Sequence, residues 1–416
     1  MAGDSTSSGL TPDFTLFESD LYHCSACNYC VEAVWEQRGI NHVCPTLLHH
    51  SPSYGYTGLG YLSQARAWHE GAELNLESLA ERAFTCTTCG NCEEACPIGL
   101  RPARVVLALR QALHQRQATP PAIAQLRENV LNRDNPMGAS RQMRGEWAQG
   151  RPGHDGGREP LLFLPGCAAC HATPGEARAA ATLLDACGWR VETLGESETC
   201  CGAPLHEVGY AGDAATKRAA LDRTIRARGI REVSALGVEC LEALNDRPPS
   251  NEQQEPLRSR HPILILRDAL ASGGIALTAR ADHPPPALIS VQDSCHATKK
   301  NDGHARDGDP AATARAILTA AGCEVIGGAA SSRFTLCCGA AGAMPIMNSE
   351  AAARMAVNRL ETLGEPGIGA IVAISPLCLG HLRTVNSGSD TPKIWGFFEF
   401  MSAHFEIART VGMISS

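Results

Sequence analysis

Residues 86–97 read CTTCGNCEEACP. Cys86, Cys89 and Cys92 stand three residues apart, and Cys96 follows after a gap of three residues, directly before Pro97. Thiolates at this spacing wrap around three corners of one [4Fe–4S] cluster, whereas the fourth, before proline, is directed toward a second cluster. The stretch therefore predicts a protein with two such clusters.

A second run of three cysteines lies upstream. It is Cys24-x2-Cys27-x2-Cys30, and its Cys44-Pro45 pair arrives only after an insertion of residues 31–43. If the fourth cysteine of each run crosses to the other cluster, the first ligand set is Cys24, Cys27, Cys30 and Cys96, and the second set is Cys86, Cys89, Cys92 and Cys44. Zinc is the alternative, but a tetrahedral zinc site does not explain triple runs that end in Cys-Pro.

The composition of the whole chain agrees with a metal-binding globular protein. The chain has 416 residues, of which 19 are cysteine, with 44% hydrophobic and 19% charged residues. These proportions exclude general disorder, and the length predicts about two or three domains. The net charge of −8, without a long basic run, argues against nucleic acid as a partner.

The cellular location is predicted from what the sequence lacks. We see no apolar stretch of about 18 residues and no basic start followed by an apolar run, so we expect neither a transmembrane helix nor a secretory signal. A cytoplasmic protein is expected, peripheral to the inner membrane only through a partner. Disulfides are rare in the cytoplasm, so metal binding is the expected role of the cysteines.

The predicted fold class is α plus α/β. Apolar residues recur at helix spacing over 74–84 and 103–117, so residues 1–145 are expected to form an all-α, ferredoxin-like domain with two [4Fe–4S] sites. Residues 145–160 and 247–262 are rich in polar residues, Gly or Pro and are expected linkers. They delimit two further domains, over 160–247 and 262–416.

The second part of the chain contains an internal repeat. Each copy has an apolar strand ending near a cysteine, an alanine-rich helix, a Cys-Cys-Gly triplet, a second such helix and a final cysteine. The offset between the copies grows only from 128 residues at Cys167/Cys295 to 138 residues at Cys240/Cys378. We therefore expect two duplicated α/β units related by pseudo-two-fold symmetry.

The repeat predicts four ligands in each copy. The third ligand set is Cys167, Cys200, Cys201 and Cys240, and the fourth set is Cys295, Cys337, Cys338 and Cys378. We attribute the glycine after each vicinal pair to close approach of the backbone to a cluster. Cys170 competes with Cys167, because it begins the same Cys-His-Ala-Thr tetrapeptide as Cys295, although the strand offset favours Cys167. Cys187 and Cys323 have no counterpart in the other copy and are expected to be buried and inert.

From Cys24 to His381 the order of motifs resembles a superfamily in which a double-cubane ferredoxin domain precedes two cysteine-rich CCG domains. It includes the D-type subunit of heterodisulfide reductase, its two-chain relatives, the DsrK-type proteins of sulfite reduction and the iron–sulfur subunits of glycolate and lactate oxidases. The resemblance implies that the N-terminal clusters exchange electrons with a flavoprotein. It also implies that the CCG cysteines of heterodisulfide reductases hold non-cubane clusters that cleave a disulfide.

The chain departs from the disulfide-cleaving pattern at the end of each CCG motif. That pattern ends in Cys-x-x-Cys, whereas Ala243 and His381 stand here in place of the last cysteine. Four cysteines are enough for one ordinary cubane, and His381 is a candidate additional ligand, because imidazole also binds iron–sulfur clusters. One or two further clusters, cubane or non-cubane, are expected in the CCG domains.

The favoured function is an iron–sulfur electron-transfer subunit of a multi-subunit oxidoreductase. It would relay electrons between a flavoprotein, either an FAD-containing oxidase or a heterodisulfide-reductase A-like subunit, and a quinone, a thiol/disulfide or another acceptor. A membrane quinone-reactive subunit is an additional candidate partner. The alternative is a catalytic subunit that reduces a disulfide or sulfur carrier at a CCG cluster, with His206 and His296 as proton donors.

Two smaller expectations complete the sequence analysis. No nucleotide-binding glycine motif is visible, so the chain itself is expected to bind neither nucleotide nor flavin. The aromatic stretch 393–411 (KIWGFFEFMSAHFEIARTV) is expected to form a C-terminal helix that packs on the second CCG unit.

Overall fold

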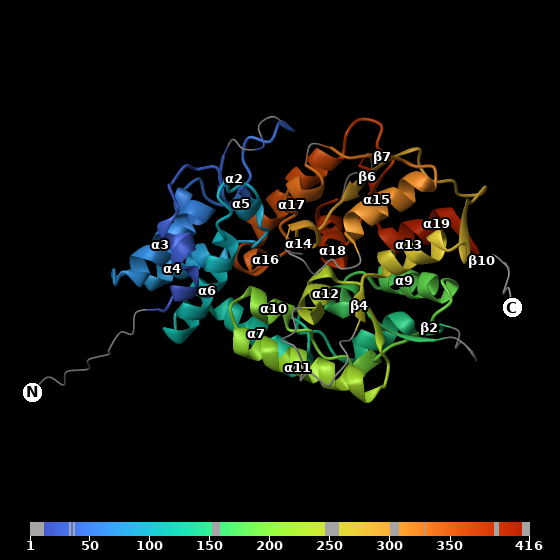
Figure 1. Ribbon diagram of the computed structural model, residues 1–416, viewed down its shortest axis with the longest axis horizontal. Coiled ribbons are helices and arrows are strands. Elements are labelled where there is room, and N and C mark those ends of the chain that lie inside the picture. Colours follow the sequence, from blue (N-terminus) through green and yellow to red (C-terminus); the bar gives the residue numbers. More distant parts are fainter. Residues whose placement is uncertain are drawn as a thin grey trace, which may run out of the picture.

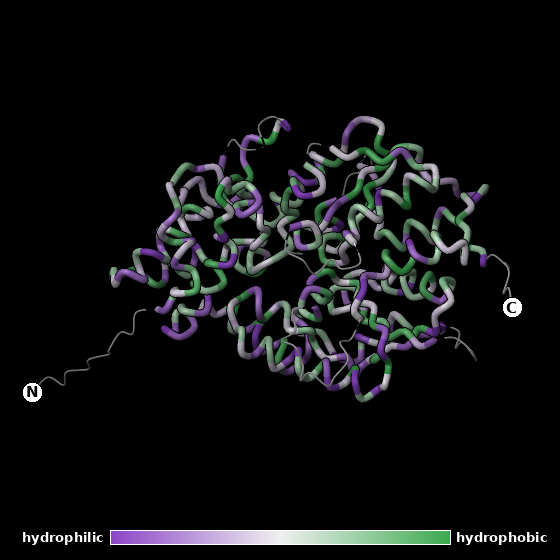
Figure 2. Tube along the Cα trace, in the orientation of Figure 1, coloured by the Kyte–Doolittle hydropathy of each residue, from purple (hydrophilic) through white to green (hydrophobic). Residues whose placement is uncertain are grey.

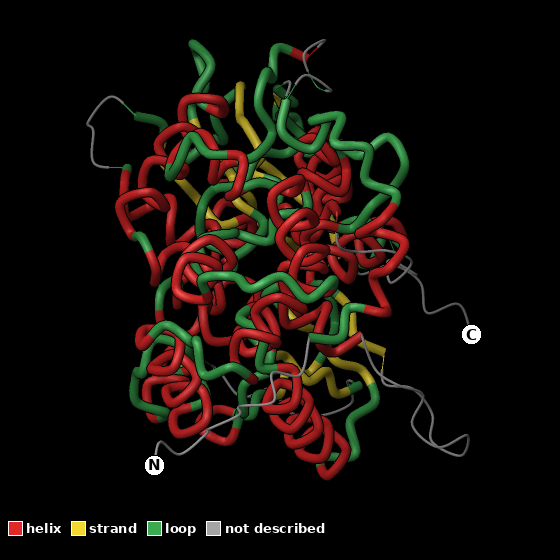
Figure 3. The backbone as a smooth tube through the Cα atoms, turned by 90° about the vertical axis from the view of Figure 1, so that its left-hand side faces the viewer, coloured by secondary structure: helices red, strands yellow, loops and turns green. Residues whose placement is uncertain are grey.

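The computed structural model describes residues 12–32, 35, 38–151, 159–245, 258–299, 308–328, 330–386 and 391–409. A helical region occupies one end of the molecule, and two α/β units lie beside each other at the other end (Figure 1). Strands of the α/β units lie among the helices (Figure 3). None of the helices in the described part of the chain is both long and apolar enough to span a lipid bilayer.

The helical region contains the two expected helices. The predictions over 74–84 and 103–117 are confirmed by α4 (Leu76–Phe84) and α6 (Pro102–Gln115). The Asn75 side chain caps α4 by accepting a hydrogen bond from the Ser78 amide at 2.8 Å. The other elements are η1 (Thr15–Phe17), α1 (Glu18–Tyr22), α2 (Pro45–His49), η3 (Tyr54–Tyr56), α3 (Gly58–His69), α5 (Asn91–Glu94), α7 (Pro121–Arg133) and η4 (Gln142–Ala148), with one isolated bridge between Glu32 and His42.

The two α/β units have parallel sheets with the same strand order. The first is β2-β1-β3-β4 and the second is β7-β6-β8-β9. Leu161 pairs with Glu232 in the first sheet and Ile289 pairs with Ala370 in the second, so the register keeps the sequence offsets of the repeat. The strands are β1 (Pro160–Leu164), β2 (Arg190–Glu192), β3 (Glu232–Ala235), β4 (Arg258–Arg260), β6 (Leu288–Gln292), β7 (Glu324–Ile326), β8 (Ala370–Ala373) and β9 (Lys393–Gly396).

Helices cover both sheets and join the units through a common core. Phe163 of the first unit and Ile289 and Phe400 of the second belong to one buried cluster. The outer helix α11 alternates hydrophilic and hydrophobic residues along its length (Figure 2). The helices are α8 (Gly166–His171), α9 (Pro174–Ala186), α10 (Ala203–Glu207), α11 (Ala211–Ala227), α12 (Val238–Asn245), α13 (Pro262–Ala271), α14 (Cys295–Lys299), α15 (Pro310–Ala320), α16 (Met344–Met347), α17 (Ser349–Leu363), α18 (Pro376–Val385) and α19 (Phe397–His404), with 3-10 turns η5 (Gly195–Ser197) and η6 (Ser332–Phe334).

The structure differs from the sequence analysis in the connecting segments. The expected linker 145–160 begins inside η4, where Trp147 is buried against Phe163 with ring centroids 5.6 Å apart. The expected linker 247–262 contains β4, because its parallel pairing with β3 completes the first sheet. Residues 152–158 and 247–257 of these stretches lie outside the described residues.

The prediction of a single C-terminal helix over 393–411 is wrong. The stretch forms β9, then α19, then β10 (Phe405–Arg409), which pairs antiparallel with β5 (Ile275–Ala279). Its apolar residues fall partly in strands and partly in a helix. In so short an aromatic run, strand alternation and helix spacing cannot be told apart. Residues 410 and 411 lie outside the described residues.

The glycine after each vicinal cysteine pair meets a backbone constraint in addition to the expected approach to a cluster, which stays a prediction. Gly202 and Gly339 both have a φ of +88°, a left-handed conformation that favours glycine. A Cβ on Gly339 would lie 2.6 Å from the carbonyl oxygen of Ala352, and one on Gly202 would lie 2.5 Å from that of Ala214. This constraint comes from the left-handed turn and from the packing of α11 and α17 against it.

We expect Gly339→Ala to lower the free energy of unfolding by roughly 2–4 kcal/mol, because backbone strain and a clash act together. Gly322→Ala is the matched control: Gly322 has a φ of +93°, but a Cβ added there would meet no heavy atom within 4 Å, so only the strain of about 1 kcal/mol applies. Anaerobic denaturant titration followed by circular dichroism measures both. Equal losses in the two variants would contradict the steric argument.

A buried carboxyl group joins the two α/β units. Glu176 on α9 accepts hydrogen bonds from the backbone amides of Phe398 and Glu399, at the start of α19, at 3.1 and 2.9 Å. Burial raises the pKa of Glu176 to about 8, although these amides act in the opposite direction. The folded protein thus holds a proton here that the unfolded chain releases near the ordinary pKa of 4.5.

The unfolding free energy is therefore expected to fall as pH rises from about 5 to 8, by about 1.4 kcal/mol for each unit of the pKa difference. Glu176→Gln should remove this part of the pH dependence, because the amide does not titrate. Denaturant midpoints at pH 5.5, 7 and 8.5 for both proteins test the expectation. Parallel pH profiles for wild type and variant would refute it.

Candidate iron–sulfur sites

The structure brings the first ligand set together. Cys24, Cys27, Cys30 and Cys96 line one small pocket with Leu59 and Leu62 of α3. Ala26 and Asn28 have positive φ values of 54° and 68°, which let the chain wrap around this pocket. Burial raises the pKa of Cys30 to about 11, and the other three thiols add to the effect. The crossing of Cys96 to the earlier run is thus present in the geometry.

The second set lies next to the first. Burial raises the pKa of Cys44 to about 12, and its neighbours Cys86 and Cys89 raise it further. Cys44 therefore reaches the later run in spite of the insertion before it. Burial also raises the pKa of Cys92, and the nearby charge of Cys30, from the first set, adds to this. The two sets are therefore close enough to interact electrostatically.

The third set surrounds a small void in the first α/β unit. Cys167, Cys200, Cys201 and Cys240 all line it, and the Sγ atoms of Cys201 and Cys240 are 3.2 Å apart. Cys170 is instead buried in the core between the units. Cys167 follows the end of β1 by three residues, as Cys295 follows the end of β6. The structure thus places Cys167, rather than Cys170, in the position of Cys295.

The fourth set is buried in the second α/β unit. The Sγ atoms of Cys338 and Cys378 are again 3.2 Å apart. The Gly339 amide donates to the Cys337 Sγ at 3.3 Å, as the Gly202 amide does to Cys200 at 3.4 Å. The two sets therefore repeat one local geometry.

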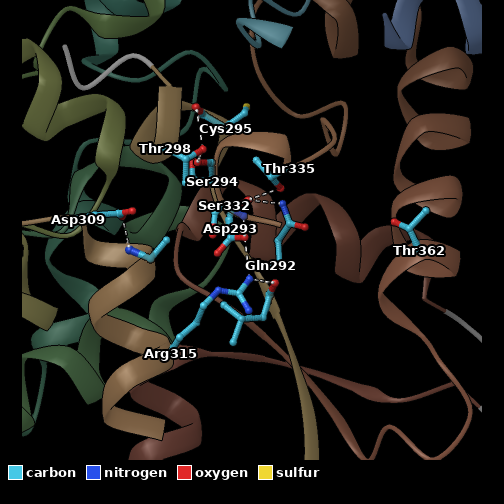
Figure 4. A network of polar contacts seen from close by, with 12 residues as sticks. Gln292, Asp293, Ser294, Cys295, Thr298, Asp309, Arg315, Ser332, Thr335 and Thr362 are labelled. Atoms are coloured by element: carbon cyan, nitrogen blue, oxygen red, sulfur yellow. Dashed lines mark hydrogen bonds and ion pairs between the residues drawn. The ribbon is translucent and has the colours of Figure 1, made fainter. Parts of the chain in front are cut away.

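A polar network holds the loop that precedes Cys295. The Asp293 carboxylate accepts hydrogen bonds from the Arg315 guanidinium and from the Ser332 amide, both at 2.7 Å (Figure 4). Thr298 donates to the Ser294 carbonyl at 3.1 Å, which closes the first turn of α14. Asp293 thus links the end of β6, helix α15 and the segment that leads to Cys337.

The second and fourth sets meet at one junction. Cys89, Cys295 and Cys337 form a buried cluster of their own. Cys337 hydrogen bonds to the other two thiols and lowers the pKa of both, and the Lys299 ammonium lowers them further. The sulfur atoms of the ferredoxin-type run and of the second CCG motif are therefore in direct contact.

Two buried arginines beside the CCG sets were missed in the sequence analysis. Arg144 forms an ion pair with Glu198 at 3.2 Å, next to the third set. Arg359 donates to the Gln292 Oε1 at 2.6 Å, and Cys338 and Cys378 are among the groups that interact with its charge. Neither arginine belongs to a cysteine motif. A lone arginine in a helix or turn carries no pattern that points to a metal site.

The donor groups fit iron–sulfur clusters. Each set offers four thiols, which are the ligands of [4Fe–4S] centres, and iron binding releases the thiol protons that burial otherwise retains. Within the described residues, no three histidine, cysteine or carboxylate side chains converge closely enough to hold a single metal ion. The ligand roles themselves are part of the proposal below.

The remaining candidates lie at the margins of the sites. The Nε2 of His381 donates to the Ala352 carbonyl at 3.1 Å, which leaves only Nδ1 for a ligand role that stays a prediction. Cys323 is buried in the core, and Cys187 packs against its edge. His206 lines a cavity beside Cys201, and His296 lies 3.6 Å from a Glu242 carboxylate oxygen.

Comparison with known families defines the class of protein. A family model for the 4Fe–4S dicluster domain matches residues 19–100, and the cysteine-rich domain matches residues 161–242 and 289–383. The chain therefore belongs to the proteins that join a 4Fe–4S dicluster domain to two CCG cysteine-rich domains, as the order of motifs implied.

Relatives in this class are named as reductases or oxidoreductases. The chain is 22% identical over 396 residues to the D-type subunit of the dihydromethanophenazine:CoB–CoM heterodisulfide reductase of Methanosarcina barkeri, covering 90% of both chains. It is 24% identical to the EtfAB:quinone oxidoreductase of Syntrophomonas wolfei, covering 86% of this chain and 54% of that protein. It is also 24% identical to a probable iron–sulfur-binding oxidoreductase, FadF, of Bacillus subtilis, covering 73% and 43%. The chain thus spans about half the length of the last two.

We expect Arg144→Met to cost roughly 3–5 kcal/mol of unfolding free energy, because it leaves the Glu198 carboxyl buried without its partner. The double variant Arg144→Met/Glu198→Gln should recover most of this loss. Arg66→Met is the control, since the Arg66–Glu70 pair is exposed on both sides and should contribute less than about 0.5 kcal/mol. Anaerobic denaturant titrations measure all four proteins. A double variant no more stable than Arg144→Met would show that the pair does not act as a unit.

Proposed function

We propose that this chain is the electron-transfer subunit of a multi-subunit oxidoreductase, with one [4Fe–4S] cluster in each N-terminal set and one iron–sulfur cluster in each CCG set. It exchanges electrons with a flavoprotein and passes them toward an acceptor at the CCG end. The domain order shared with named reductases and oxidoreductases supports the redox role. Bound clusters would supply one-electron steps, and the protein positions them.

The observation that carries the proposal is the contact of Cys89 with Cys337 and Cys295. It places the second set directly against the fourth, while Cys30 and Cys92 bring the first set near the second. The third set lies across a cavity from His296 and Leu377, the neighbours in sequence of Cys295 and Cys378. These positions support a series that runs from the first set through the second to the fourth, with the third set across the cavity.

The first set lies at the end of the series that is exposed to solvent. Cys27 is exposed, and so are Ser25, Ala26 and Ile98 beside it. No charged side chain lies among these four residues, so a partner can approach without desolvating an ion. This surface suits a flavoprotein that delivers or receives electrons one at a time.

A second candidate function is catalysis at the CCG end, with a disulfide or sulfur carrier as substrate. The same cavity favours it, because Cys167, Cys201 and Cys240 all reach the cavity wall. The absence of a fifth cysteine at Ala243 and at His381 in the sequence weighs against a pair of disulfide-cleaving clusters. We therefore place this function second.

Electron paramagnetic resonance of the anaerobically loaded, reduced chain tests the proposal. The clusters of the second and fourth sets should show magnetic coupling, because their ligands touch. Cys338→Ser/Cys378→Ser should remove the coupling and lower the iron content from roughly 16 to roughly 12 per chain. Cys323→Ser, a buried cysteine outside every set, is the control and should change neither. Uncoupled signals in the fully loaded wild type would contradict the proposed path.

A further inference from the structure

A cavity of about 340 Å³ lies between the two CCG units. Its inner wall holds the third-set cysteines Cys167, Cys201 and Cys240 on one side and His296 and Leu377 on the other. This volume is in the range of pockets that take small organic ligands. The cavity thus adjoins both CCG sets at the end of the proposed electron path.

The mouth of this cavity is apolar. Met137, after α7, and Ile346, on α16, lie on its rim and are 48% and 40% exposed. Leu126 and Pro345 also line the cavity. An entering ligand would therefore contact aliphatic and proline side chains. Such a surface favours apolar ligands over ionic ones.

The described part of the cavity wall offers no cationic side chain to an anionic ligand. Among the described residues that line it, none is lysine or arginine, whereas Glu207 and Glu239 are both present. Arg144 and Lys299 lie outside the lining of the cavity: Arg144 pairs with Glu198, and Lys299 contacts Asn91 and donates to the Thr335 carbonyl at 2.6 Å. An anionic disulfide would find no lysine or arginine to pair with among the wall residues that the structure describes, so burying its charges there would cost desolvation free energy.

We propose that the cavity binds an uncharged, ring-type two-electron carrier, the chemical class of the quinones. This rests on the proposed electron-transfer function, whose acceptor it specifies. In the reducing direction, two electrons from the flavoprotein arrive one at a time through the cysteine sites, and the quinone takes up two hydrogen ions from the buffered solvent to become a quinol. Glu239 and His296 lie on the wall where ring oxygens would accept or donate hydrogen bonds.

Binding of 2-heptyl-4-hydroxyquinoline N-oxide, a fluorescent quinone-site probe, tests the inference on the loaded full-length chain. We expect saturable quenching of its fluorescence by the wild type. Met137→Asp and Ile346→Asp should each weaken binding about tenfold or more, because a carboxylate at the rim must be desolvated. Met143→Asp and Val357→Asp are matched controls, since these side chains are 42% and 44% exposed and lie off the cavity; they should leave binding unchanged.

Equilibrium dialysis with glutathione disulfide, an anionic probe, tests whether the chain binds a disulfide instead. Weak, unsaturable uptake of this disulfide supports the inference. Saturable disulfide binding without probe binding would overturn it, as would equal weakening by rim and control variants. The magnetic coupling between the second and fourth sets, measured on the same samples, separates the two proposals: coupling without probe binding refutes only the quinone class, and absent coupling refutes the electron path.

Discussion

The contact between the ferredoxin-type loop and the second CCG motif is the constraint on which the rest of the structure depends. Cys89 and Cys337 belong to segments almost 250 residues apart in the sequence, yet their thiols share one buried cluster. The backbones of the two loops that carry these cysteines also pack closely against each other. A Cβ on Gly342 would lie 2.6 Å from the Cys86 carbonyl, so the fourth-set loop packs directly on the second-set loop.

Buried side chains hold this junction and connect it to the first α/β unit. The Arg110 guanidinium donates to the carbonyls of Ala83 and Cys86 at 2.7 and 2.6 Å and also contacts the Glu207 carbonyl. Thr88, between the cysteines of the second set, donates to the Glu207 carboxylate. A fully buried arginine is tolerated here because several carbonyl oxygens surround it. The same contacts fix the ferredoxin-type run against α10.

The cysteine sites share a need for positive charge. Four thiolates around an iron–sulfur core leave a net negative charge, which a low-dielectric interior does not stabilise by itself. Arg144 lies beside the third set, Arg359 beside the fourth, and Lys299 at the junction of the second and fourth. Arg144 reaches its site from η4, Arg359 from α17 and Lys299 from the helix that begins with Cys295, so the fold supplies the compensating charge.

The cysteine groups could be predicted from the sequence because the spacing of the cysteines is enough to identify them. Short-range runs locate Cys86, Cys89 and Cys92, and the duplication pairs Cys167 with Cys295. The spacing does not predict which groups contact each other. Nothing in the run around Cys89 indicates a contact with Cys337. The strand β4 and the split of residues 393–409 into strand, helix and strand were also missed, because short elements are decided by tertiary pairing rather than by local periodicity.

The central claim is that four cysteine sets hold four clusters in one continuous series. Anomalous diffraction at the iron absorption edge, from anaerobic crystals of the loaded chain, tests it most directly. We predict iron density at all four sets, with the density of the second set adjoining that of the fourth across the Cys89–Cys337 contact. Iron confined to the two N-terminal sets, with zinc or no metal at the CCG sets, would contradict it.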